Sequence, residues 1–189
     1  EGANETERKQ RVGLLFDLNK IAGEERKTLE KLRKNQYPSG GWPWFDKMPE
    51  SNYVTLYIVE GMGHLKKLGI NTFNEPKNHN MLEKAINFID DEFVKYYKEL
   101  KKVYSDKELK EGNFLTFTAI NYLYARSYFT EIPISSKTKE AFNFFIGKAE
   151  KYWLKTGKYS QAMISMFLHR YGNKTVPNDI LKSLKEPKI

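Results

Sequence analysis

The sequence predicts an all-α fold of paired helices that form an incomplete α/α toroid. Apolar residues recur at spacings of three and four along most of the chain, which is the period of an amphipathic helix. Strongly apolar stretches alternate with amphipathic ones over roughly fifty residues, a period typical of stacked helical repeats. The alternation expected of a half-buried strand is missing, apart from a short extended piece at 130–134. We therefore expect apolar helices in an inner layer and amphipathic helices outside it.

The N-terminal part is predicted to hold a polar segment followed by two helices. Residues 1–12 are mostly polar, and we place the helical domain at 13–189. Residues 13–22 (GLLFDLNKIA) predict a short apolar helix, and residues 24–36 predict a charged one. Because the chain does not begin with methionine, we expect it to be a piece of a longer protein.

A glycine turn rich in aromatic residues follows the charged helix. Pro38 and the pair Gly40-Gly41 end that helix and give the backbone the freedom that a tight reversal needs. The three aromatic side chains that follow are too apolar for an ordinary surface loop, and we expect them to plug the end of a helical layer. The residues assigned to this structural motif are Gln36, Gly40, Gly41, Trp42, Trp44 and Phe45.

The next predicted helix spans residues 53–68. It carries one continuous apolar stripe, formed by Val54, Ile58, Met62 and Leu65. Gly61 and Gly63 lie inside it, and each lowers helix propensity by roughly 1 kcal/mol relative to alanine. We expect both glycines to be compensated by the close approach of a neighbouring helix.

The remainder of the chain predicts further helices and their connections. A loop at 71–79 and a polar connection at 105–112 flank a long amphipathic helix at 80–104. Later helices are predicted at 113–129, at 137–155 with Ser136 as its N-cap, at 159–171, and after Pro177. The helices at 53–68, 113–129 and 159–171 are the most apolar and form the predicted inner layer.

Composition limits the chemistry and the partners of the chain. Its 189 residues have a net charge of +8 and include no cysteine, which excludes disulfides and thiol catalysis within these residues. Lysines are interspersed with acidic residues along the helices, so we interpret the charge as a solvated surface and expect no nucleic-acid partner. No apolar run approaches the ~20 residues of a membrane-spanning helix, and we expect no direct membrane insertion.

Two polar groupings have both a structural and a chemical interpretation. Glu60 and His64 share a helix face at a spacing of four and suit either a stabilising pair or an acid–base or metal site. The structural interpretation is favoured, because a His-Glu-x-x-His motif is missing. Asp90-Asp91-Glu92 is similar to the acidic box of prenyl-transfer enzymes, but the second acidic position is wrong, so we predict a solvated acidic patch.

Carboxylates and aromatic residues suggest a further alternative. Asp46, Glu50 and Glu60 are candidate carboxylates of a glycosidase or lyase, which would need two of them about 5–9 Å apart in an open cleft beside a tryptophan. Burial of Trp42 and Trp44 would argue against such a site. Aromatic residues at helical spacing are interpreted as core rather than as a ligand box; they are Tyr122, Tyr124, Tyr128, Tyr152 and Trp153.

Two family resemblances add to this interpretation. Gln36-x-x-x-Gly40-x-Trp42 is similar to the Gln-x-x-x-Gly-x-Trp repeat of terpenoid cyclases, which ties outer helices together. Over residues 5–185 the chain resembles the helical domain of bacterial alpha-2-macroglobulin family proteins. The segments that carry this resemblance are GLLFDLNKIAGE, LRKNQYPSGGWPWF, YVTLYIVEGMGHLKKLGI, INFIDDEFVKYYKELKK, INYLYARSYF and KYWLKTGKYSQAMISMFLHRYG.

This second resemblance implies a non-catalytic domain of a broad-spectrum protease trap. Such proteins act outside the cytoplasm, in the periplasm or at the cell surface, and enclose a protease after it cuts a bait region. Many carry a thioester in a Cys-x-Glu-Gln motif, which is not found in these residues. The implied partners are neighbouring domains of the parent chain and target proteases, and no cofactor is implied.

Two other functions remain open at the level of sequence. The aromatic glycine turn suits an α/α-toroid enzyme or a carbohydrate-binding module that acts on polysaccharide. A general helical scaffold for peptides is a third possibility, and it would display an exposed apolar groove.

Overall fold

The computed structural model describes residues 23–70 and 72–185, which are mostly helical. The chain divides into two compact units, at residues 1–36 and 37–189. In the first unit, residues 23–35 form a helix, in agreement with the helix predicted at 24–36. The polar segment predicted at 1–12 and the helix predicted at 13–22 lie outside the described residues.

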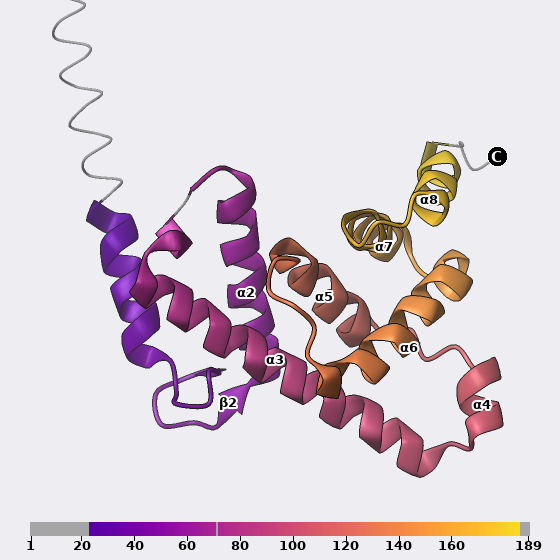
Figure 1. The fold of residues 1–189 in the computed structure, drawn as a ribbon, viewed down its shortest axis with the longest axis horizontal. Helices are drawn as coiled ribbons and strands as arrows, with labels where there is room; N and C mark the ends of the chain where they lie inside the picture. Colours follow the sequence, from indigo (N-terminus) through magenta and orange to yellow (C-terminus); the bar gives the residue numbers. More distant parts are fainter. Residues whose placement is uncertain (1–22, 71, 186–189) are drawn as a thin grey trace, which may run out of the picture. The chain divides into compact units, whose positions relative to one another are not determined.

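The second unit contains the remaining elements, of which Figure 1 labels helices α2 to α8 and strand β2. Its longer helices are α2 (Asn52–Lys67), α3 (Pro76–Val103), α4 (Asp106–Glu111), α5 (Phe117–Arg126), α6 (Ser136–Tyr152), α7 (Lys158–Arg170) and α8 (Thr175–Lys185). Short 3-10 helices are η1 (Thr72–Asn74), η2 (Ser127–Phe129) and η3 (Trp153–Lys155). Strands β1 (Trp42–Pro43) and β2 (Glu50–Ser51) pair antiparallel, with Trp42 opposite Ser51.

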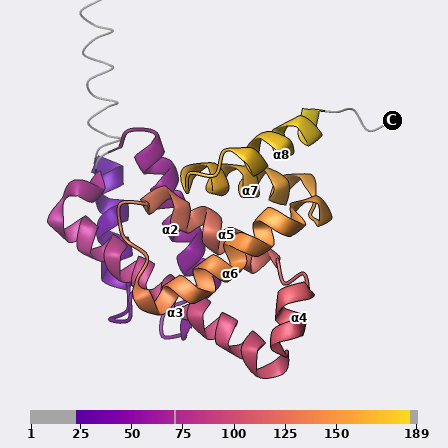
Figure 2. The same cartoon turned by 45° about the vertical axis from the view of Figure 1, so that its right-hand side comes forward.

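The helices of this unit pack in two layers. Helix α5 packs between α2 and α7, while α3 packs against α6 and also contacts α2 and α5 (Figure 1 and Figure 2). Helix α8 packs on α7. The row α2–α5–α7 consists of the three helices that the sequence assigns to an inner layer, and we refer to them as the inner helices.

The helices of the inner layer run in the same direction. Near their beginnings, Phe117 of α5 and Tyr159 of α7 stack with ring centroids 6.5 Å apart. At the other end, Gly63 of α2 and Arg170 of α7 both lie against Tyr128, which follows α5. The C-terminal ends of the inner helices therefore meet in one place.

Helix α5 lies at the centre of the core and is buried on nearly all sides. Its buried side chains include Ala119, Ile120, Tyr122, Leu123, Tyr124, Ala125 and Arg126. The apolar stripe predicted for α2 is rotated from the one observed, because Val54, Ile58 and Leu65 are only half-buried. The buried face instead includes Thr55 and Gly63, which an apolar pattern does not count. This face is wide because α2 packs against both α3 and α5.

Several predicted boundaries are wrong. Helix α3 begins at Pro76, where residues 71–79 were predicted to be a loop, because proline is well suited to the first turn of a helix. The predicted polar connection at 105–112 contains α4, whose start is fixed by a capping box between Ser105 and Glu108.

Other differences concern caps and strands. Thr116 caps α5, so residues 113–116 are not helical. Ser135, not Ser136, caps α6. No strand forms at 130–134, and the paired strands lie instead on either side of the loop that follows Trp42. Within the described part of the chain, no helix is long and apolar enough to cross a membrane.

Candidate functional site

The glycine turn presses its backbone against α3. Gly40 has a φ of 101°, and a Cβ atom there would lie 2.1 Å from the Lys84 carbonyl oxygen. A Cβ atom at Gly41 would lie 2.8 Å from the Phe88 ring. The Trp42 side chain is buried, and the backbone N–H of Trp42 donates to the Thr55 hydroxyl at 3.0 Å. Close approach therefore requires glycine at both positions, and the turn is fastened to α2 and α3.

Trp44 and Phe45 do not plug a helical layer, which corrects the prediction made for them. They are 58% and 73% exposed. Both residues lie in the loop that joins β1 to β2. The Trp44 ring stacks on Tyr53 with centroids 5.4 Å apart and planes 11° from parallel.

The remaining motif residues behave differently from one another. A Cβ atom at Gly63 would lie 2.4 Å from Tyr128, so a neighbouring segment does approach α2 closely there. Nothing lies within 4 Å of a Cβ atom at Gly61, where the predicted close approach is wrong. Gln36 follows the helix of residues 23–35, and its N–H donates to the Leu32 carbonyl at 3.0 Å. Its role in the motif stays a prediction.

Each inner helix leaves one stripe of side chains off the packed core. We call the combined surface the open face. On α2 it comprises Tyr53, Tyr57, Glu60 and His64; on α5 and η2 it comprises Phe117, Asn121 and Tyr128, with the buried Tyr124 on the same side of the helix; on α7 it comprises Tyr159, Met166 and Arg170. Spacings of three, four or seven residues place each group on one side of its helix.

Contacts between the stripes place them on the same side of the layer. His64 and Tyr128 have ring centroids 5.2 Å apart, which joins the stripes of α2 and α5. The Arg170 guanidinium carbon lies 3.7 Å from the Tyr128 centroid and joins the stripe of α7. The open face therefore displays aromatic rings, some exposed and some partly buried, along all three helices.

A chain of polar contacts crosses the open face. His64 Nε2 lies 3.7 Å from Glu60 Oε1 and 3.5 Å from the Tyr124 hydroxyl. The Tyr124 and Tyr128 hydroxyls are hydrogen-bonded at 2.7 Å. Burial raises the pKa of Glu60, although the nearby His64 opposes the shift. Burial and the bond to Tyr128 raise the pKa of Tyr124. Glu60 and His64 thus form the predicted pair, and the pair extends to two tyrosines.

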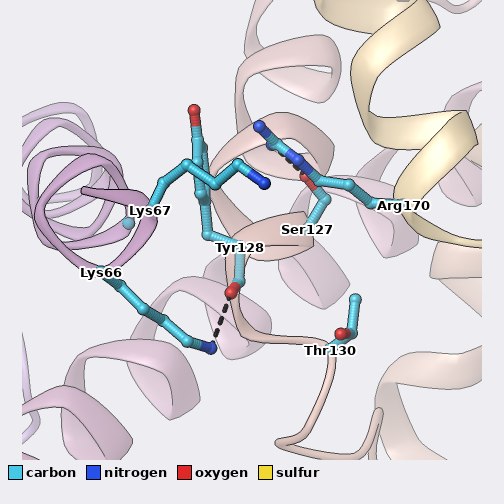
Figure 3. A pocket seen from close by; sticks show the side chains of 7 residues that line it. Lys66, Lys67, Ser127, Tyr128, Thr130 and Arg170 are labelled. Atoms are coloured by element: carbon cyan, nitrogen blue, oxygen red, sulfur yellow. Dashed lines mark hydrogen bonds between the residues drawn. The ribbon is translucent and has the colours of Figure 1, made fainter. Parts of the chain in front are cut away.

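A basic pocket lies at the end where the inner helices meet (Figure 3). It encloses about 310 Å³ and is lined by Gly63, Lys66, Lys67, Ser127, Tyr128, Thr130 and Arg170. Lys66 Nζ donates to the Tyr128 carbonyl at 3.0 Å and to Glu131 at 2.5 Å. Arg170 Nη1 donates to the Ser127 hydroxyl at 2.9 Å. In Figure 3 the side chains of Lys67 and Arg170 extend toward one another from α2 and α7.

Sequence reasoning did not find this pocket. Its cations come from the last turns of two helices that are far apart in the chain. The available signal was the presence of basic residues in both last turns, but that pattern is common because cations stabilise helix C-termini.

The candidate carboxylates are not gathered into one cleft. Asp46 is exposed. Glu50 accepts a hydrogen bond from Ser39, which lowers its pKa. A pocket of about 350 Å³ is lined by Ser39, Glu50, Phe88, Asp91, Glu92 and Lys95, and includes neither Asp46, Glu60 nor a tryptophan. No group of three or more His, Asp or Glu side chains is placed to hold a metal ion within the described residues.

Asp90 corrects the prediction of a solvated acidic patch. It is 5% exposed and lies between α3 and α5, where its carboxylate accepts from Tyr122 at 2.7 Å and from Arg126 Nε at 3.2 Å. Burial raises the pKa of Asp90, while the Arg126 charge and the Tyr122 hydrogen bond oppose the shift. Only Asp91, with Lys137 2.8 Å away, and Glu92 fit a surface description.

The aromatic residues that the sequence assigned to the core divide into two groups. Tyr122, Tyr124 and Tyr152 are buried. Tyr128 and Trp153 are partly exposed. Tyr128 therefore belongs both to the packing of α2 on α5 and to the basic pocket.

Comparison with protein-family models, with curated proteins and with solved structures gives no match for this chain. The family resemblance in the sequence thus stays a prediction.

Proposed function

We propose that the chain is a non-catalytic helical domain of an alpha-2-macroglobulin-like protease trap, folded as part of an α/α toroid. The observation that carries this proposal is the packing of parallel inner helices α2, α5 and α7 with α3 and α6 outside them. Tyr122 of α5 donates a hydrogen bond to Asp90 of α3. Thr116, which precedes α5, is hydrogen-bonded to Tyr96, which lies further along α3. Helix α3 thus runs opposite to α5, and such alternation is what stacked α-hairpins of a toroid need.

In this proposal the domain acts by docking on neighbouring domains of the parent chain, outside the cytoplasm. The exposed rings of Trp44 and Tyr53 suit that role. A surface cluster of large apolar side chains is a common feature of interaction sites, because its burial against a partner removes apolar area from water. The target protease would be met by the whole protein and not by this domain alone.

The test is a protease-capture assay on the parent protein. An enclosed protease should still cleave a small peptide substrate but should lose most of its activity on a large protein substrate. Retention of both activities, or loss of both, would contradict enclosure. Trp44→Ala combined with Tyr53→Ala should weaken the protection of the protease, whereas Leu154→Ala, an exposed apolar residue on η3, should not.

The stacked pair also favours a second function, a carbohydrate-binding module or a polysaccharide-acting enzyme. Trp44 and Tyr53 are each 58% exposed and nearly coplanar, which is the kind of aromatic surface on which a sugar ring can lie. Glu60 and His64, on the same α2 stripe as Tyr53, form a polar chain with Tyr124 of α5 that offers groups for acid–base chemistry.

Affinity gel electrophoresis with soluble xylan, β-glucan and mannan separates the two functions. Saturable retardation by one of these polymers that is lost in Trp44→Ala, but kept in Leu154→Ala, would favour the carbohydrate function. Migration unchanged by all of them would leave the docking function as the better account of the exposed rings.

A further inference from the structure

We propose that the basic pocket binds an oxyanion, meaning a phosphate, sulfate or carboxylate group, between Arg170 and Lys67. This site is independent of the protease-trap and carbohydrate proposals. It rests on the orientation of Arg170, on the support of Tyr128 by a glycine, and on the balance of charge around the pocket.

Arg170 is held in place without using up its charge. Its guanidinium lies 3.7 Å from the centroid of Tyr128 and 5.2 Å from that of Tyr124, and Nη1 donates to Ser127 at 2.9 Å. Stacking on aromatic rings fixes the plane of a guanidinium and leaves the donors at its edge able to grip an oxyanion. Within the described residues, no carboxylate forms an ion pair with Arg170.

The support beneath Arg170 depends on a glycine. The Tyr128 ring packs directly on Gly63: a Cβ atom at position 63 would lie 2.4 Å from Cγ of Tyr128. The ring is thus enclosed between the backbone of α2 and the guanidinium of α7. Three segments of the chain therefore combine to fix the position of one partly exposed cation.

The charges around the pocket do not cancel. Lys66 is paired with Glu131. Among the described residues, neither Lys67 nor Arg170 has a carboxylate partner, so the pocket carries two uncompensated positive charges beside the hydroxyls of Ser127 and Thr130. Hydrogen bonds from charged donors to an oxyanion are roughly twice as strong as neutral ones.

Helix ends give a competing explanation for these cations. Basic residues in the last turns of α2 and α7 offset the partial negative charge of the helix C-termini, at about 0.3–1 kcal/mol each. That effect needs only proximity to the helix end. It does not require the placement of the Arg170 guanidinium over the Tyr128 ring, and it predicts a change in stability without any binding of anions.

The size of the pocket limits the ligand. A volume of about 310 Å³ is at the lower end of small-molecule sites. The pocket can therefore take an inorganic oxyanion or the anionic group of a molecule about as large as a monosaccharide.

Isothermal titration calorimetry with sodium phosphate, sodium sulfate and sodium glucuronate tests the proposal, with sodium chloride keeping the ionic strength constant. We expect saturable binding in the millimolar range, weakened at least tenfold in Lys67→Gln and in Arg170→Gln. Lys139→Gln removes another exposed lysine, on α6, and should bind as the unmodified protein does.

Each arm of this experiment has a defined meaning. Binding of phosphate or sulfate alone identifies a tetrahedral oxyanion, and binding of glucuronate identifies a carboxylate; both support the proposal. Absence of saturable binding, or equal weakening in Lys67→Gln and Lys139→Gln, overturns it. Lys67 is exposed, so Lys67→Gln keeps the test valid even if Arg170→Gln fails to fold.

Discussion

Arg126 and Arg170 lie at the same end of the inner layer, but their charges are satisfied in different ways. Arg126 is fully buried and donates to Asp90 and to the carbonyls of Phe129, Ile132 and Pro133. Arg170 is partly exposed and rests on tyrosine rings and one hydroxyl. The first arginine is satisfied by groups of the fold, whereas the second keeps donors that a ligand can use.

The difference follows from solvation. A charge removed from water is tolerated only when the protein replaces the lost hydration with a counter-ion and hydrogen bonds. Arg126 meets that requirement through one carboxylate and three carbonyls, and these contacts join α3, α5 and the connection to α6. Arg170 keeps contact with water, so the fold does not need to supply a carboxylate for it. Arg126 therefore links elements of the fold, and Arg170 is available for binding.

The largest effect is expected at the buried pair. Asp90→Asn should lower the free energy of unfolding by about 3–5 kcal/mol, because it leaves the Arg126 charge buried without its counter-ion. Urea denaturation at pH 7, followed by circular dichroism, measures the change. Asp91→Asn removes the next carboxylate, which forms an exposed pair with Lys137 at 2.8 Å, and should cost about 0–1 kcal/mol. Equal losses in the two variants would remove the distinction between buried and exposed charge.

The two tryptophans of the glycine turn extend the comparison to apolar side chains. Trp42 is 2% exposed, and Trp42→Ala should lower the free energy of unfolding by about 3–4 kcal/mol through lost burial and the cavity that remains. Trp44→Ala should change it by less than about 0.5 kcal/mol, because its ring is mostly in water. The midpoints of urea denaturation compare the variants, provided that the unfolding free energy depends on urea concentration with the same slope in each. A large loss in Trp44→Ala would mean that the exposed stack with Tyr53 stabilises the fold.

The sequence predicted the helical fold because helix formation follows from local periodicity. It could not predict the partner of Asp90, since Arg126 lies 36 positions away in the chain and the local run of acidic residues is typical of a surface. The cations of the basic pocket have the same property: Lys67 and Arg170 meet only after the helices pack. Pairing between distant residues, and not helix formation, is what the pattern leaves undetermined.

One difference between prediction and structure, the helix α4, did have a signal in the sequence. The capping box of α4 is present in the sequence as Ser105 followed three residues later by Glu108, although the segment was interpreted as a connection. Exposure of Trp44 and Phe45 had no such signal. Their apolar character predicts burial, whereas both lie exposed in the loop between β1 and β2.

The glycines of α2 test how the pocket is supported. Gly63→Ala should lower the free energy of unfolding by about 1–3 kcal/mol, because the new methyl group overlaps Tyr128. It should also weaken oxyanion binding by displacing the ring under Arg170. Gly61→Ala adds a methyl group with no neighbour within 4 Å and should raise helix stability by up to about 1 kcal/mol. Thermal denaturation distinguishes the two, and changes of the same sign would contradict the packing of Tyr128 on α2.

The smallest effect concerns the pH dependence that Glu60 gives to the open face. Burial raises the pKa of Glu60 above its ordinary value of 4.5, so the folded state holds this proton more tightly than the unfolded state does. Stability should therefore fall as the pH rises from about 4.5 through the raised pKa, where ionisation of the folded state is completed. Glu60→Gln removes this dependence. The stability of the variant relative to the unmodified protein should therefore be higher at pH 7 than at pH 4. Glu83→Gln is the matched control, because Glu83 has the same spacing from His79, at 3.4 Å, in an exposed pair. Denaturation curves at both pH values that give Glu60→Gln no larger gain than Glu83→Gln would show that burial of the carboxyl has no energetic consequence on this face.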